Sequence, residues 1–178
     1  MIYGNRIRLR AIERSDLPLF VRWLNDPEVR LGLQMYLPLS QNEEELWYEG
    51  MMKRPAEEHP LLIEIETPKG WVPVGNCGFL APNWRLRKAE IGIFIGDKKY
   101  WNQGYGSEVM RLALKLGFES MNLNRISLQV FTNNPRAIRA YEKVGFVHEG
   151  RLRQAHYDNG QYHDILIMSV LRSEWQSS

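Results

Sequence analysis

Between a predicted strand and a predicted helix, the chain reads Tyr100-Trp101-Asn102-Gln103-Gly104-Tyr105-Gly106-Ser107. The two glycines let the backbone approach a ligand closely, and the free N–H groups at the start of the helix attract anions. We therefore expect a phosphate-binding loop, although a lone Gly-x-Gly also fits an ordinary strand-to-helix turn. A nucleoside-triphosphate loop is excluded because no Gly-Lys-Ser/Thr follows. A dinucleotide-binding loop is excluded because Val109 stands where its third glycine would be.

The segments around this loop predict alternating strands and helices. Upstream, three strands form an antiparallel meander, expected at Leu61–Glu66, Val72–Leu80 and Ala89–Ile95. Downstream, apolar residues at helical spacing predict a helix at Ser107–Ser120, and a strand follows at Arg125–Phe131.

The two ends of the chain complete this pattern. Near the N-terminus we expect a strand at Ile7–Ile12, a helix capped by Ser15 or Asp16, and a helix from Ser40 to about Lys53. Near the C-terminus, Asn134-Pro135 starts a helix that Gly145 stops. Two strands then follow, around Phe146–Gly150 and Ile165–Leu171.

Composition limits the possible functions. A chain of 178 residues, 44% hydrophobic and 25% charged, without repeats or linkers, predicts a single domain over residues 1–178. No apolar run is long enough to span a membrane and no export signal is visible, so we expect a cytoplasmic protein without a membrane partner. Its net charge of +2, from 23 basic and 21 acidic residues, argues against nucleic acid as a partner. The single cysteine, Cys77, is expected to be a small buried hydrophobe, and no metal site is expected.

A second motif lies some thirty residues after the loop. The chain reads Asn134-Pro135-Arg136-Ala137-Ile138-Arg139-Ala140-Tyr141-Glu142-Lys143-Val144-Gly145-Phe146. Together with the Gly-x-Gly loop, this segment resembles the signatures of the GNAT N-acetyltransferases in kind and in order. The segments Arg8-Leu9-Arg10…Asp16-Leu17 and His163-Asp164…Met168 resemble the branch that contains ribosomal-protein N-terminal and spermidine acetyltransferases.

The resemblance implies both a fold and an activity. The fold would be α/β (α+β), with a mixed, mostly antiparallel sheet of six to seven strands and helices on both faces. The activity would be transfer of an acetyl group from acetyl-CoA to a primary amine, by direct attack in a ternary complex. One departure is that Trp101 stands where the superfamily usually has Gln or Arg, three residues before the first glycine. The usual side-chain contact to the pyrophosphate is therefore not expected, while the backbone amides of the loop remain available.

The resemblance also implies which residues bind acetyl-CoA. The pyrophosphate would lie on the loop and the pantetheine arm would pair with the end of the third meander strand. The set of expected cofactor-binding residues is Phe94, Ile95, Asn102, Gln103, Gly104, Tyr105, Gly106, Ser107, Asn134, Ala137 and Lys143. Asn134 also suits the simpler role of helix N-cap, and both roles can hold at once.

Two residues are candidates for catalysis. Tyr141 matches the position of the acid that protonates the departing CoA thiolate, although its place on an apolar helical stripe also fits a core residue. Glu90 matches the position of the base that deprotonates the amine, but it could equally be a solvent-facing residue of its strand. A base matters more for a lysine-like amine, with a pKa of about 10.4, than for an α-amine near 7.8.

The acceptor stays open at this level. A protein N-terminal amine, a polyamine or another small amine all remain candidates, and a homodimer or larger homo-oligomer is a further expectation. The alternative from another class is a catalytically silent acyl-CoA-binding regulatory domain, against which Tyr141 argues.

Overall fold

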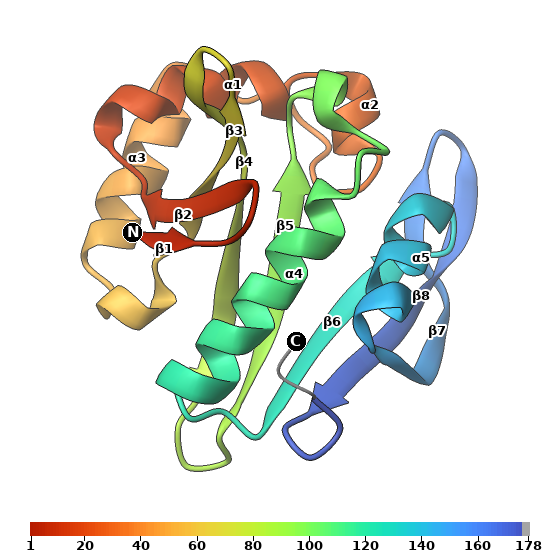
Figure 1. Ribbon diagram of the computed structural model, residues 1–178. Coiled ribbons are helices and arrows are strands. Elements are labelled where there is room, and N and C mark those ends of the chain that lie inside the picture. The colour runs from red at the N-terminus through yellow and green to blue at the C-terminus, as the bar shows by residue number, and fades with distance from the viewer. Residues whose placement is uncertain (176–178) are drawn as a thin grey trace.

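The computed structural model describes residues 1–175 and contains one eight-stranded sheet (Figure 1). The strand order is β1-β2-β3-β4-β5-β6-β8-β7, and all neighbours are antiparallel except β5 and β6. The strands are β1 (Ile2–Tyr3), β2 (Ile7–Ala11), β3 (Leu61–Thr67), β4 (Gly70–Asn83), β5 (Lys88–Ile95), β6 (Arg125–Phe131), β7 (Val147–Asp158) and β8 (Gln161–Leu171). The mixed, mostly antiparallel sheet is confirmed. Its strand count exceeds the expected six to seven because β1, at two residues, is too short to show an alternating pattern.

Helices cover both faces of the sheet, as expected (Figure 1). One face carries α1 (Leu17–Leu24) and α3 (Gln41–Met52), whose side chains form a cluster with Leu62 of β3 and Phe94 of β5. The short helix α2 (Pro27–Arg30) directly follows α1. The other face carries α4 (Tyr105–Lys115) and α5 (Pro135–Val144), which pack against Ala89 and Ile91 of β5 and against β6.

Helix ends follow the capping signals in the sequence. Ser40 accepts a hydrogen bond from the Glu43 N–H at 3.2 Å, and the Glu43 carboxylate accepts one from the Ser40 N–H at 2.8 Å, which starts α3. Gly145 ends α5 in the left-handed region, at φ 102°. Helix α4 begins at Tyr105, two residues before the expected Ser107, and it continues as a π-helical turn over Leu116–Ser120.

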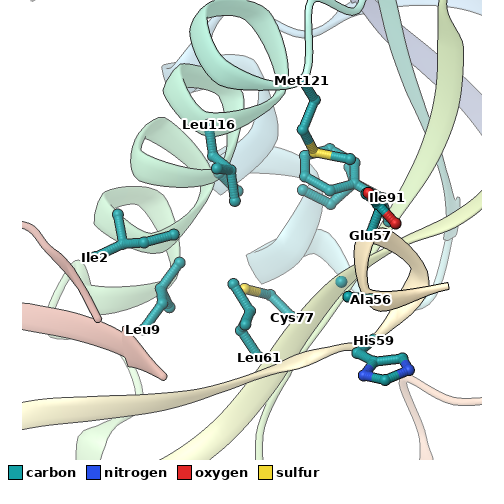
Figure 2. Close-up of a pocket in the computed structure, with 13 residues that line it drawn as sticks. Ile2, Leu9, Ala56, Glu57, His59, Leu61, Cys77, Ile91, Leu116 and Met121 are labelled. Carbon is teal, nitrogen blue, oxygen red and sulfur yellow. The ribbon is translucent and has the colours of Figure 1, made fainter. Parts of the chain in front are cut away.

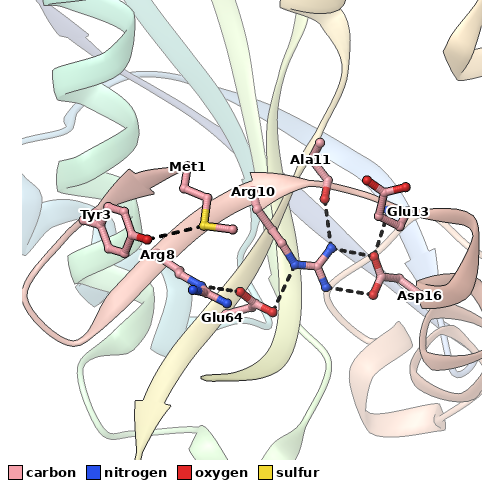
Figure 3. A network of polar contacts seen from close by, with 8 residues as sticks. All are labelled: Met1, Tyr3, Arg8, Arg10, Ala11, Glu13, Asp16 and Glu64. Atoms are coloured by element: carbon pink, nitrogen blue, oxygen red, sulfur yellow. Dashed lines mark hydrogen bonds and ion pairs between the residues drawn. The ribbon is translucent and has the colours of Figure 1, made fainter. Parts of the chain in front are cut away.

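A network of ion pairs joins the first strands to the first helix (Figure 3). Glu64 of β3 accepts from Arg8 at 2.5 Å and from Arg10 at 3.0 Å, both on β2. Arg10 also pairs with Asp16, just before α1, at 2.8 Å. Because Glu64 and Asp16 are both buried, removal of a single partner would leave a buried charge uncompensated. The Arg8-Leu9-Arg10…Asp16 motif therefore fixes the position of α1 on the sheet.

Candidate active site

The site lies where the two parallel strands separate. Strands β5 and β6 are paired only from Lys88 opposite Arg125 to Glu90 opposite Ser127. Beyond that point β5 pairs only with β4, and β6 pairs only with β8. A groove of about 850 Å³ occupies the opening, lined by residues from β5, β6, α5, the 102–106 loop and the segment after α2. The sheet itself thus provides an opening between its two faces.

The backbone of β5 is partly unpaired along this groove. The Gly96 N–H donates to the Val74 carbonyl of β4 at 2.7 Å, and a β-carbon on Gly75 of β4 would lie only 2.0 Å from the Phe94 carbonyl oxygen. Backbone groups alternate in direction along a strand. The groups of Phe94 and Gly96 therefore face β4, and those of Ile93 and Ile95 face the groove. The Ile95 carbonyl accepts a hydrogen bond from the Trp101 indole N–H at 2.7 Å.

The glycine loop borders the groove in an alternating way. Asn102, Gly104 and Gly106 line it, whereas Gln103, Tyr105 and Ser107 do not, and Ser107 is buried in the first turn of α4. Gly104 has a φ of 85°, which favours glycine, and Asn102 has a φ of 60°. A β-carbon on Gly106 would meet no protein atom within 4 Å, so its bare backbone faces open space.

Side chains hold this loop from outside the groove. Arg6 donates to the Gln103 carbonyl at 3.4 Å and pairs with Glu108 at 2.9 Å. The Gln103 amide donates to the Lys99 carbonyl at 2.6 Å, which turns it back toward the preceding turn. The loop is therefore preorganised, but its basic neighbour Arg6 is neutralised by Glu108.

Helix α5 and its N-cap form the far wall. Asn134 caps the helix, because its side-chain oxygen accepts from the Ala137 N–H at 3.2 Å. Asn134, Ala137 and Lys143 all line the groove, and a β-carbon on Gly32 would lie 3.1 Å from the Asn134 amide nitrogen. The segment Leu31–Leu33 after α2 thus closes over the start of α5. Sequence reasoning missed this segment, because its composition carries no motif.

The position of Tyr141 fits both a core residue and a side chain at the groove. It packs on the core, with its ring centroid 5.9 Å from that of Phe146, and it also lines the groove. Among residues 1–175 its hydroxyl has no hydrogen-bond partner. Burial raises the pKa of Tyr141 to about 12, so the phenol stays protonated at neutral pH.

Glu90 reaches the groove from the opposite face of the sheet. Its neighbours Ala89 and Ile91 are buried against α4, so alternation directs Glu90 toward the face that carries α1 and α3. It is half-buried, lines the groove, and has no ion-pair partner within the described chain. Phe94, four residues further along the same face, packs on Phe20 and Trp23. The acid and base candidates therefore approach one opening from opposite faces.

A second hollow lies between α4 and the sheet (Figure 2). This apolar cavity of about 300 Å³ is bounded by Leu9, Leu61 and Cys77 of the sheet, opposite Leu116 and Met121. Cys77 is buried, as expected, and burial raises its pKa to about 12, so the thiol stays neutral. Within residues 1–175 no cluster of His, Cys, Asp or Glu could hold a metal ion, and no helix there is long and apolar enough to cross a membrane.

Comparisons with known proteins identify the family. The family described as Acetyltransferase (GNAT) domain matches residues 6–147. Spermidine N(1)-acetyltransferase of Vibrio cholerae is 29% identical over 97% of this chain and 96% of that protein. The putative ribosomal N-acetyltransferase YdaF of Bacillus subtilis is 26% identical over 97% of this chain and 95% of that protein.

Solved structures give the same result. The spermidine N-acetyltransferase of Vibrio cholerae, in complex with CoA and spermine, has a TM-score of 0.87 at 28% identity, covering 96% of this chain and 98% of that one. A structure of the same enzyme described as dodecameric has a TM-score of 0.79 at 29% identity, over 96% of each chain. Neither comparison supports a silent acyl-CoA-binding domain. The chain belongs to the GNAT family of acetyl-CoA-dependent N-acetyltransferases.

Proposed function

We propose that acetyl-CoA lies in the groove with its pyrophosphate on the loop 102–106 and its thioester between Tyr141 and Glu90. The observation that carries this placement is the opening between β5 and β6, which joins the two faces of the sheet. The start of α4 offers N–H groups to the pyrophosphate. Because the backbone groups of Phe94 face β4, the pantetheine amides would pair with the groove-facing groups of Ile93 and Ile95 in place of the expected Phe94 and Ile95. The Ile95 carbonyl also accepts from the Trp101 indole.

The transfer then follows from the two side chains. The neutral amine forms a bond to the acetyl carbon, and the carbon–sulfur bond breaks with its electron pair leaving on sulfur. Tyr141 donates its hydroxyl proton toward the sulfur, while Glu90, directly or through water, takes the proton that the amine loses. Since the amine arrives from the α1 and α3 face and the thioester from the α5 face, the two substrates meet in the opening.

The pKa of Tyr141 shapes this step. A CoA thiol has a pKa of about 8.5, so complete proton transfer from a phenol with a pKa of about 12 would be uphill by roughly 5 kcal/mol. Tyr141 therefore acts first as a hydrogen-bond donor to the developing thiolate, in a site where such bonds are strong. The proton released by the amine can complete the transfer afterwards.

For the acceptor we propose a polyamine. The support is the similarity to spermidine acetyltransferase along nearly the whole chain, together with the carboxylate of Glu90, which lines the groove and has no ion-pair partner within residues 1–175. The Glu28 carboxylate at the groove, in contrast, is paired with Lys98. A polyamine is a primary amine with a high pKa, and it needs both a base and nearby negative charge.

An acceptor screen tests this choice. CoA release would be measured at saturating acetyl-CoA with spermidine, spermine, peptides with free N-termini, amino acids and aminoglycosides. We expect the highest kcat/KM for spermidine or spermine. A higher value for a peptide, lost when its N-terminus is blocked, would assign a protein N-terminal acceptor instead.

Three broader proposals accompany this function. We propose that residues 1–178 act as one catalytic unit, because the sheet runs from Ile2 to Leu171. The enzyme should act in the cytoplasm, where acetyl-CoA is available, and cell fractionation would test this. A homo-oligomer is proposed from the dodecameric relative, and light scattering of the purified chain would measure its size.

A further inference from the structure

The glycine loop lacks a charged side chain of its own for the pyrophosphate. Trp101 stands at the position before the loop, and its indole is fixed by the hydrogen bond to the Ile95 carbonyl at 2.7 Å. The Gln103 amide is bonded to Lys99, and Arg6 is paired with Glu108. Backbone N–H groups alone would therefore have to hold a doubly negative pyrophosphate.

A guanidinium from another element lies beside this loop. Arg136, in the first turn of α5, places its guanidinium carbon 3.6 Å from the centroid of the Trp101 ring. Trp101 and Arg136 both line the groove, together with Asn102 and Gly104. Stacking on a fixed indole orients the planar guanidinium without using its N–H donors.

Arg136 has no anionic partner within the protein. Several other arginines of the described chain that lie near the sheet are paired with carboxylates, among them Arg8 and Arg10 with Glu64 and Arg125 with Glu149. In residues 1–175 no carboxylate pairs with Arg136, although it is half-buried and burial lowers its pKa. A partly buried cation without a counter-ion costs free energy, which an anionic ligand would recover.

We propose that Arg136, held against Trp101, pairs with the pyrophosphate of acetyl-CoA and supplies the side-chain charge that the loop lacks. This rests on the proposed placement of the pyrophosphate at residues 102–106. Trp101 then acts as a support for a phosphate-binding arginine, where a glutamine or arginine in the loop would bind directly. Arg136 becomes the side chain that selects for the nucleotide part of the donor.

Donor analogues of decreasing charge test the proposal. Arg136→Met keeps an unbranched apolar stem and removes the charged guanidinium, and Arg111→Met on the exposed side of α4 is the matched control. Affinities would be measured by calorimetry for CoA, dephospho-CoA and pantetheine. Arg136→Met should bind CoA and dephospho-CoA about 10- to 100-fold more weakly, with pantetheine unaffected and Arg111→Met unchanged. Arg136→Lys should recover part of the loss.

Other outcomes would overturn the assignment. A loss seen with CoA but not with dephospho-CoA would place Arg136 at the 3′-phosphate. An equal loss with pantetheine, or a fall in kcat with KM for acetyl-CoA unchanged, would show that Arg136 acts on Tyr141 or on folding. If Gly104→Val weakens CoA binding and Arg136→Met does not, the role of Arg136 is refuted but the proposed loop site is retained. If Gly104→Val also binds normally, the proposed loop site fails.

Discussion

The groove between β5 and β6 and the apolar cavity beneath α4 lie close together, since neighbouring residues of β5 line both, yet they differ in chemistry. The groove collects polar groups that have no hydrogen-bond or ion-pair partner in the described chain, namely the hydroxyl of Tyr141, the carboxylate of Glu90 and the guanidinium of Arg136. The cavity is bounded mainly by aliphatic side chains and the neutral thiol of Cys77. Unpaired polar groups are costly in a folded protein, so their concentration marks a place that a ligand completes. The volume of a hollow does not by itself identify a ligand site.

Removal of the Tyr141 hydroxyl should have the largest effect. A positioned general acid contributes roughly 100- to 10,000-fold, so Tyr141→Phe should lower kcat by about that factor. The ring still packs against Phe146, and the hydroxyl has no partner within residues 1–175, so the melting temperature and acetyl-CoA affinity should stay nearly constant. If the variant keeps the wild-type kcat under conditions where chemistry limits the rate, Tyr141 is a core residue without a catalytic role.

The sequence predicts the helix ends and the glycine loop because the signals for them are local. The Ser40–Glu43 capping box, Asn134 before a proline and Gly145 after the last helical turn each fix one helix end within a few residues. The loop glycines were likewise visible from their spacing. These features need only short stretches of chain to act.

Other features required the folded chain. The contact between Arg136 and Trp101 joins residues 35 positions apart, and no sequence motif predicts it. The direction of the Phe94 carbonyl depends on its register with Gly75 in β4. The segment Leu31–Leu33 lines the groove because it follows α1 and α2, and α1 is held on the sheet by its apolar cluster and by the ion pair of Arg10 with Asp16. Such tertiary contacts leave no periodic pattern.

Replacement of Glu90 should have an effect that depends on the acceptor. With a polyamine, almost all of the primary amine is charged at neutral pH, so we expect Glu90→Gln to lower the rate about 100-fold. Without the base, the rate should rise about tenfold per pH unit up to the pKa of the amine. With an N-terminal peptide the loss should be much smaller, and the ratio of the two losses measures the role of the base. Full activity on spermidine at neutral pH would make Glu90 a surface residue.

The two loop glycines separate ligand contact from backbone strain. Gly104→Val forces a β-branched residue to a φ of 85°, at a cost of about 1–3 kcal/mol, so acetyl-CoA should bind about 10- to 100-fold more weakly. Gly106→Ala is the gentler change, because its β-carbon meets no protein atom within 4 Å and alanine favours the helix by up to about 1 kcal/mol. It should raise the melting temperature while weakening acetyl-CoA binding about tenfold. Unchanged affinity in both variants, measured by calorimetry, would move the pyrophosphate elsewhere.

The smallest effect is expected in the apolar cavity, where Cys77→Val should leave catalysis unchanged. Valine fills part of the 300 Å³ hollow, which should stabilise the fold by about 0.5–1 kcal/mol at pH 7. The substitution should also remove a loss of folding stability at alkaline pH. Burial raises the pKa of the Cys77 thiol from 9.0 to about 12, so above pH 9 only the unfolded chain ionises and the native state loses stability as pH rises toward 12.

At pH 10 the ionisation of the unfolded thiol should add roughly 1 kcal/mol to the stability advantage that Cys77→Val gains by filling the cavity. Thermal melts of both proteins at pH 7 and pH 10 would measure it, with kcat and KM for acetyl-CoA determined in parallel. Cys77 lies on β4, whose register with β5 sets the direction of the groove-facing backbone. A change in KM without a change in stability would therefore show that the cavity is coupled to the groove through these two strands, and that the two hollows form one functional unit.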